Sequence, residues 1–211
     1  MERSELGWLI GYCQDTVGLV LCAGLEPEEL LAALTGVAQP PLLYLTDEEA
    51  DAAVADAETY SFDHVDLDEE ALERHGFRRA GVETVMRAGR TTRPGWSFAL
   101  QKFQPFVTPP PYTVTLLAAA PQAVEFGHTI NWDELFVYAE HGRVLTALDP
   151  ARAPERDSEL PGRFPASGPA PGGGAAFLEY VAAALRLGIS YDTLAGPLLS
   201  VAVPLARPVG D

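Results

Sequence analysis

Histidines are the first residues to consider for catalysis or metal binding, because imidazole titrates near neutral pH and ligates metals. His64 and His75 fall in an acidic region, His128 falls on an apolar strand pattern, and His141 precedes a glycine in a turn. A metal site would need two or three histidines at ligand spacing, together with carboxylates. The four histidines do not have that spacing, so we predict no metal ion and no other cofactor.

The densest group of oxygen ligands is the segment Asp63-His64-Val65-Asp66-Leu67-Asp68-Glu69-Glu70. Its carboxylates could ligate Ca²⁺, but it lacks the glycine at which a calcium-binding loop turns sharply. We therefore interpret this segment as a solvated acidic loop rather than as a metal site.

His128 lies in an alternating segment, Ala123 to Trp132, in which Glu125 points to the opposite strand face. The simpler interpretation is a histidine that is hydrogen-bonded within the core. The alternative is a small hydrolase or transferase, in which His128 acts as a base beside a carboxylate such as Asp133 or Glu134. A polar cleft at His128 would favour the enzyme, and a buried imidazole would favour the core.

The two cysteines, Cys13 and Cys22, both lie among apolar residues, where a reduced thiol behaves as a small hydrophobic group. Neither has neighbours in the sequence that would lower its pKa and make it a nucleophile. The chain also lacks Gly-x-Ser-x-Gly, His-Glu-x-x-His and Cys-x-x-Cys motifs. We therefore predict no catalytic residues, and we favour a non-enzymatic function.

The acidic residues are distributed unevenly. Residues 1–73 contain eighteen acidic and one basic side chain, for a charge of −17; residues 74–211 contain twelve acidic and thirteen basic, for +1, which gives the net −16. Free nucleic acid is excluded as a partner, because it binds clustered lysines and arginines. Two interpretations remain open: the acidic half keeps the protein in solution, or it binds a basic protein.

The second interpretation predicts a protein-binding module, such as an immunity-like or antitoxin-like inhibitor or an assembly adaptor, that docks a basic partner through an acidic face. Exposed aromatic rings beside the charge would contribute to such an interface. The predicted partner-binding residues are Asp47, Glu48, Asp51, Tyr60, Phe62, Asp66, Glu69 and Glu70.

The pattern of predicted helices and strands indicates a single α+β domain, with an antiparallel sheet of about five to seven strands and helices mostly on one face. The sheet core is predicted over residues 82–149, including a strand that begins near Tyr112 and a hairpin that turns at His141-Gly142. Val17 to Ala23 and Leu42 to Leu45 are predicted to be further strands.

The acidic helical region spans residues 25–76. One helix begins near Pro27 and ends at Gly36, and a short one ends at Gly76. Between them, Thr46 and Glu49 form a predicted capping box for a helix that runs to about Glu58. Because the apolar residues of this helix are nearly all alanine, we expect it to bury little area and to lie on the surface.

The remainder of the chain contains a proline- and glycine-rich loop over residues 150–174 and then a helix from Ala175 to Leu187, ended by Gly188. An apolar segment follows to Leu205. The N-terminal apolar run is interrupted by Gln14 and Asp15, so we predict neither a membrane span nor a signal peptide, and we expect a cytoplasmic protein.

The order of these motifs resembles a family of uncharacterised actinobacterial proteins that is known only as a domain of unknown function. The matching motifs are Gly24-Leu25-Glu26-Pro27-Glu28-Glu29, Gly95-Trp96, Asn131, Phe136-Val137-Tyr138-Ala139-x-x-Gly142, Asp149-Pro150 and Leu187-Gly188-Ile189. The resemblance implies an α+β fold over most of the chain, and it implies no activity.

Overall fold

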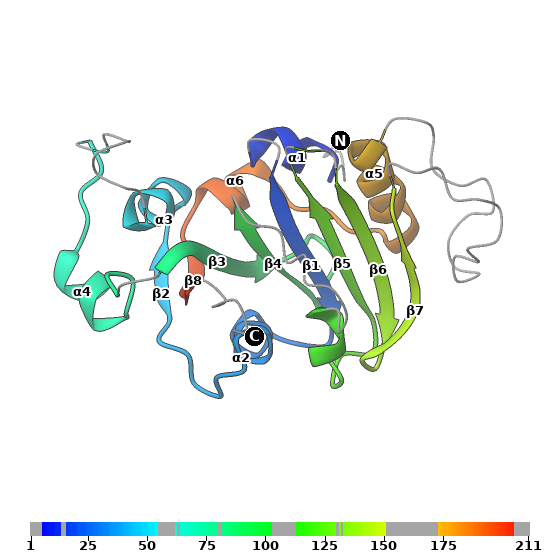
Figure 1. Ribbon diagram of the computed structural model, residues 1–211, viewed down its shortest axis with the longest axis horizontal. Coiled ribbons are helices and arrows are strands. Elements are labelled where there is room, and N and C mark those ends of the chain that lie inside the picture. The colour runs from blue at the N-terminus through cyan, green and yellow to red at the C-terminus, as the bar shows by residue number, and fades with distance from the viewer. Residues whose placement is uncertain are drawn as a thin grey trace, which may run out of the picture.

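The computed structural model describes residues 6–13, 16–54, 62, 64–79, 82–102, 113–129, 131, 133–150 and 173–204 (Figure 1). Eight strands form one open antiparallel sheet in the order β2-β8-β3-β4-β1-β5-β6-β7. The strands are β1 (Val17–Ala23), β2 (Leu43–Leu45), β3 (Val82–Arg90), β4 (Trp96–Lys102), β5 (Ala123–His128), β6 (Glu134–Glu140), β7 (Arg143–Leu148) and β8 (Leu198–Pro204). The α+β prediction is confirmed, with more strands than the predicted five to seven.

Six α-helices and one 3₁₀ helix complete the described part of the chain. They are α1 (Trp8–Tyr12), α2 (Pro27–Thr35), α3 (Asp47–Val54), α4 (Glu69–Arg74), η1 (Thr113–Leu116), α5 (Gly173–Leu185) and α6 (Tyr191–Ala195). The helices α1, α3, α5 and α6 lie along one face of the sheet, and α2 and η1 cover the other (Figure 1).

The central strand β1 shows how the sequence produces this three-layer arrangement. Leu19 and Leu21 pack into the core under α1 and α5, whereas Val20 and Cys22 pack into the core under α2 and η1. A strand that is buried on both faces requires a continuous apolar sequence rather than an alternating one. The run Val17–Ala23 has that composition.

Local signals place most of the element ends. Glu26 and Glu29 form a capping box at the start of α2, and Gly36 ends the helix in the left-handed region with φ 68°. At the start of α3, the Thr46 N–H donates to Glu49 and the Glu49 N–H donates to the Thr46 hydroxyl, over 2.7 and 3.2 Å. Asp68 caps α4 by accepting from the Ala71 N–H. These side chains satisfy backbone groups that a helix end leaves free.

The hairpin between β6 and β7 turns at His141 and Gly142, which have φ values of 49° and 72°. Two consecutive positive φ angles are those of a type I′ turn, whose twist matches that of the flanking strands. The prediction of a turn at this dipeptide is confirmed.

Two predicted elements differ from the structure. The segment that begins near Tyr112 is a 3₁₀ helix from Thr113 rather than a strand, because the Glu125 carboxylate accepts the Val114 N–H and fixes the first turn. The C-terminal helix ends at Leu185, where Arg186 takes φ 54°, rather than at Gly188. The predicted loop lies largely outside the described residues, since 151–172 are not among them.

The strand β8 was not predicted as a strand at all. Its sequence was expected only to be an apolar segment, because the period of a short apolar run cannot separate strand from helix. In the structure it pairs with both β2 and β3, so the last described segment of the chain lies inside the sheet.

Candidate functional site

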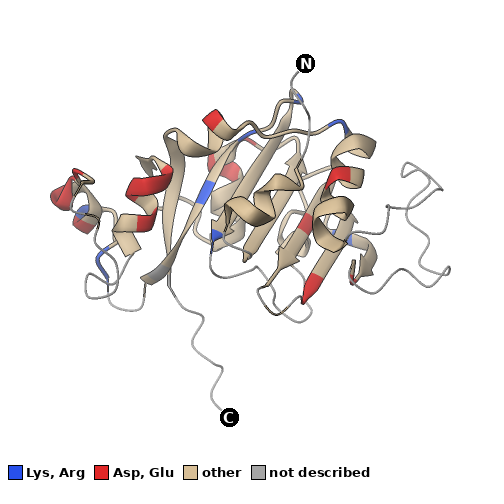
Figure 2. Cartoon of the chain, turned by 90° about the horizontal axis from the view of Figure 1, so that it is seen from above, with Lys and Arg blue, Asp and Glu red and all other residues tan. Residues whose placement is uncertain are grey.

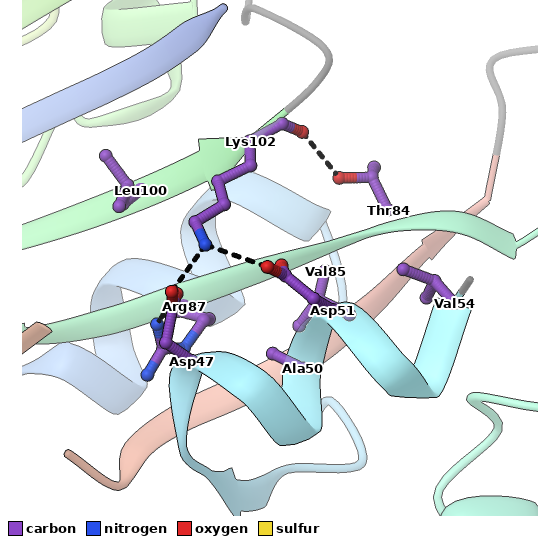
Figure 3. Close-up of a pocket in the computed structure, with 9 residues that line it drawn as sticks. All are labelled: Asp47, Ala50, Asp51, Val54, Thr84, Val85, Arg87, Leu100 and Lys102. Carbon is purple, nitrogen blue, oxygen red and sulfur yellow. Dashed lines mark hydrogen bonds and ion pairs between the residues drawn. The ribbon is translucent and has the colours of Figure 1, made fainter. Parts of the chain in front are cut away.

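A buried ion-pair cluster joins α3 to the sheet. The Asp47 carboxylate contacts Arg87 Nη1 of β3 at 2.6 Å and Lys102 Nζ of β4 at 2.5 Å (Figure 3). The same Lys102 Nζ lies 3.0 Å from Asp51 Oδ2. Arg87 is almost completely buried, with 4% of its side chain exposed.

The positions of the two carboxylates follow from helix geometry. Asp47 and Asp51 are four residues apart, so they lie on one face of α3, one turn from each other. Ala50 and Ala53 lie buried between α3 and the sheet, and their short side chains let the helix approach the strands closely. This alanine-rich helix was expected to lie on the surface and to bury little area; its outer residue Glu48 is exposed, but its inner face packs on the sheet and buries three alanines.

Other groups complete the cluster. Arg87 also donates to the carbonyl oxygens of Leu45 and Gly196, at 3.2 and 2.9 Å. The ring of Tyr12 in α1 lies 5.0 Å from Lys102 Nζ, a distance suited to a cation–π contact. Burial and the hydrogen bond to Asp47 raise the pKa of the Tyr12 hydroxyl.

The cavity beside these charges measures about 10 Å³, which is room for no more than one water molecule. Burial raises the pKa of Asp51, and the nearby Lys102 opposes that shift. The cluster thus ties α3 to its neighbours, and it does not form a ligand pocket.

His128 and Glu134 form a second buried polar pair, on neighbouring positions of β5 and β6. The imidazole Nδ1 lies 2.9 Å from Glu134 Oε1, and the same oxygen accepts the Gly174 N–H at 2.7 Å. His128 is only 3% exposed. Of the two carboxylates considered beside His128, Glu134 is the one in contact.

An imidazole that acts as a base must be reached by its substrate, and a buried His128 does not fit that requirement well. The Gly174 contact suggests a structural role instead, because it fastens the start of α5 to the sheet. The hydrolase or transferase alternative remains a prediction that rests on this one pair.

A substitution at Gly174 tests this structural role. A Cβ at that position would overlap Glu134 Oε1 and lie 2.9 Å from Phe126 Cζ. We expect Gly174→Ala to lower the free energy of unfolding by about 2 kcal/mol in urea denaturation, the usual cost of overpacking. The control is Gly11→Ala in α1, where a Cβ meets nothing within 4 Å. That variant should be as stable as the wild type or more so, and equal stabilities of the two variants would contradict the contact.

Six of the twelve exposed carboxylates among the described residues lie at the end of the molecule formed by α3 and α4 (Figure 2). We call this group the acidic end; its members are Glu48, Asp66, Asp68, Glu69, Glu70 and Glu73. Three exposed arginines, Arg74, Arg78 and Arg79, lie in the same region, so these nine side chains carry a charge of −3.

Two of the arginines are paired within the acidic end. Arg78 makes a two-pronged contact with Glu69, through Nε at 2.9 Å and Nη2 at 2.6 Å. Arg74 pairs with Glu70 one turn away. Exposed pairs of this kind contribute little to stability, but they reduce the net negative charge of the surface.

The eight residues predicted to bind a partner are therefore not all in one environment. Glu48, Asp66, Glu69 and Glu70 are exposed in the acidic end, and Phe62 is half-buried. Asp47 and Asp51 belong to the buried cluster instead. Tyr60 lies outside the described residues.

The cluster partners Arg87, Lys102 and Tyr12 were missed by sequence reasoning. A signal for Arg87 was present, since a charged residue within the run Val85-Met86-Arg87-Ala88 indicates a buried cation that needs an acidic partner. No pattern in the sequence indicated that the partner would be Asp47, forty residues earlier.

The cysteines agree with their prediction. Cys13 and Cys22 are both buried, and burial raises the pKa of each thiol to about 12, so they are inert hydrophobic groups. Within the described ranges, no group of three or more His, Cys, Asp or Glu side chains is arranged to hold a metal ion. None of the helices that the structure describes is long and apolar enough to span a membrane.

The chain matches no protein-family model, and it has no match among curated proteins or among solved structures. The resemblance noted from its sequence motifs therefore remains a prediction.

Proposed function

We propose that this protein is a non-enzymatic protein-binding module that docks a basic partner protein through its acidic end. The supporting observation is that six of the twelve exposed carboxylates among the described residues gather in the acidic end, whereas the other six are divided among α2, α5, α6 and the turn before β6 (Figure 2). Complementary charge accelerates association and selects among partners. An immunity-like or antitoxin-like inhibitor and an assembly adaptor are the functional types that this mode of binding fits.

The buried cluster reduces the number of carboxylates that a partner could contact. Asp47 and Asp51 are held by Arg87 and Lys102, so they are not available to a partner. Asp68 caps α4, and Glu69 is held by Arg78. Glu70 pairs with Arg74, so the members of the acidic end that make neither an ion pair nor a helix cap within the described ranges are Glu48, Asp66 and Glu73.

These three carboxylates give a test that leaves the fold intact. A variant with Glu48→Lys, Asp66→Lys and Glu73→Lys should capture a partner from source-cell lysate about tenfold less well than the wild type, because reversed rim charges slow association. The control reverses three exposed carboxylates elsewhere, Asp133, Glu179 and Asp192. It changes the net charge by the same amount, and it should retain capture.

Salt provides a second readout. Capture should weaken between 0.15 M and 1 M salt, since the screening length falls from about 8 Å to about 3 Å. Equal capture by the wild type and the acidic-end variant would refute the proposal. Equal loss in both triple variants would refute it too, because the effect would then depend on net charge rather than on this surface.

A further inference from the structure

An apolar groove of about 540 Å³ lies on the same side of the sheet as α2, beyond the C-terminal end of that helix. Its floor includes Met86 of β3 and Val201 and Val203 of β8. The helix stops at Gly36, and none of the other helices that the structure describes covers the outer part of these strands on this face. One wall is the loop that contains Pro40 and Pro41, and the opposite wall is the turn after α4. This volume is within the range of about 300–1,000 Å³ that is typical of small-molecule sites.

The groove offers very few hydrogen-bonding groups. Met86 of β3 lies between β4 and β8, and Val201 and Val203 of β8 pair with β3 on one side, whereas the pairing of β8 with β2 ends at Ser200. Pro40 and Pro41 have no N–H, and the Thr35 hydroxyl donates to the Leu31 carbonyl oxygen at 2.8 Å. A bound peptide could find backbone partners only along the outer edge of β8, and its other amides would remain unsatisfied, at a substantial cost. An aliphatic chain has no such groups.

The charge at the groove differs from that of the rest of the molecule. None of the lining residues is acidic, in a chain with 30 acidic side chains and a net charge of −16. Arg79 lies on the groove wall and is exposed. Its neighbours Arg74 and Arg78 are held by glutamates, whereas Arg79 makes no ion pair in the part of the chain that the structure describes. A free guanidinium suits a carboxylate.

His75, also on that wall, strengthens this arrangement. Its Nδ1 lies 2.8 Å from the Ala71 carbonyl oxygen, to which it donates, and Nε2 is thereby left available at the groove. Arg79 and His75 thus form one small polar end of the groove, where Arg79 carries the positive charge, beside a long apolar floor.

We propose that this groove binds a medium-chain aliphatic carboxylate, with its carboxylate at Arg79 and its chain along Met86, Val201 and Val203. This ligand is independent of the basic protein partner proposed for the acidic end. Its chemistry matches both features of the groove, because the alkyl chain needs no hydrogen bonds and the head group needs a cation.

Isothermal titration calorimetry with decanoate, below its micelle concentration, tests the proposal. The wild type should show one saturable site. Arg79→Gln should weaken decanoate binding about tenfold, since a hydrogen bond to a charged group is lost. Arg143→Gln, which removes an exposed arginine on β7, should leave the affinity unchanged. Decanol, which has the chain without the charge, should bind about tenfold more weakly than decanoate and equally to wild type and Arg79→Gln.

A second variant locates the site. Val37 lines the groove and is 47% exposed, so Val37→Glu should fold normally and should weaken decanoate binding by placing a like charge beside the ligand. The proposal is overturned if decanoate shows no saturable binding to the wild type. It is also overturned if the Arg79 and Arg143 variants bind alike, if decanol binds as tightly as decanoate, or if Val37→Glu has no effect.

Discussion

Replacing Asp47 with alanine is expected to lower the free energy of unfolding by about 3 kcal/mol, the cost of leaving buried charges without a partner. Asp47 contacts both Arg87 and Lys102, whose side chains are 4% and 12% exposed. Without Asp47, Lys102 keeps Asp51, but Arg87 keeps only carbonyl oxygens. Urea denaturation followed by circular dichroism measures the change.

The matched control is Glu48→Ala. Both residues lie in the first turn of α3, so both variants lose the same favourable interaction with the helix dipole. Glu48 is exposed, and its loss should cost about 0.5 kcal/mol. A difference between the two variants of less than about 1 kcal/mol would contradict the role assigned to the cluster.

Replacing Phe177 with alanine is expected to lower the free energy of unfolding by about 4 kcal/mol, as is typical for a large aromatic side chain in a core. Phe177 is 1% exposed, and its ring centroid lies 4.8 Å from that of Phe136 at an interplanar angle of 66°. This edge-to-face contact joins α5 to the sheet. The same denaturation experiment measures the loss.

Glu179→Ala serves as the comparison for Phe177, because it changes an exposed residue in the same helix. Its effect should stay within about 0.5 kcal/mol. If Phe177→Ala were as mild as Glu179→Ala, then α5 would not be anchored through this ring.

The features that could be predicted from the sequence are those whose partners are close along the chain. The capping box of Thr46 and Glu49 spans three residues, and the turn at His141 and Gly142 depends on the backbone preferences of two. In each case the side chain or the glycine acts on its own segment of backbone. Interactions within one short segment form independently of distant parts of the chain, so their sequence pattern indicates the local structure directly.

The features that could not be predicted depend on distant partners. Asp47 and Lys102 are 55 residues apart, and the inward orientation of α3 follows from that contact rather than from its alanines. Thr113 to Leu116 has strand-forming residues, but a carboxylate from Glu125 turns it into a 3₁₀ helix. Tertiary contacts override local preference at such positions.

The candidate site was predicted in part for the same reason. An alternating pattern places His128 on one strand face, and Asp133 and Glu134 were the two candidate carboxylates beside it, of which Glu134 makes the contact. The carboxylates of residues 1–73 could be counted from the sequence, but which of them are buried and which are exposed could not be predicted. Their division into buried and exposed groups depends on Arg87 and Lys102, which come later in the chain.

The position of β8 has a consequence for how the protein is made. The N-terminal part of a chain emerges from the ribosome first. The strands β1, β3 and β4 can therefore pair during synthesis, but one edge of β3 has no partner strand until β8 emerges. Within the described part of the chain, β8 is the only strand that pairs with β2, so until β8 emerges β2 and the neighbouring helix α3 are not joined to the sheet through this strand. An open strand edge is a template for aggregation. We therefore expect this half of the molecule to fold only after β8 has been synthesised, at a rate set by closure of the long connection between β2 and β8.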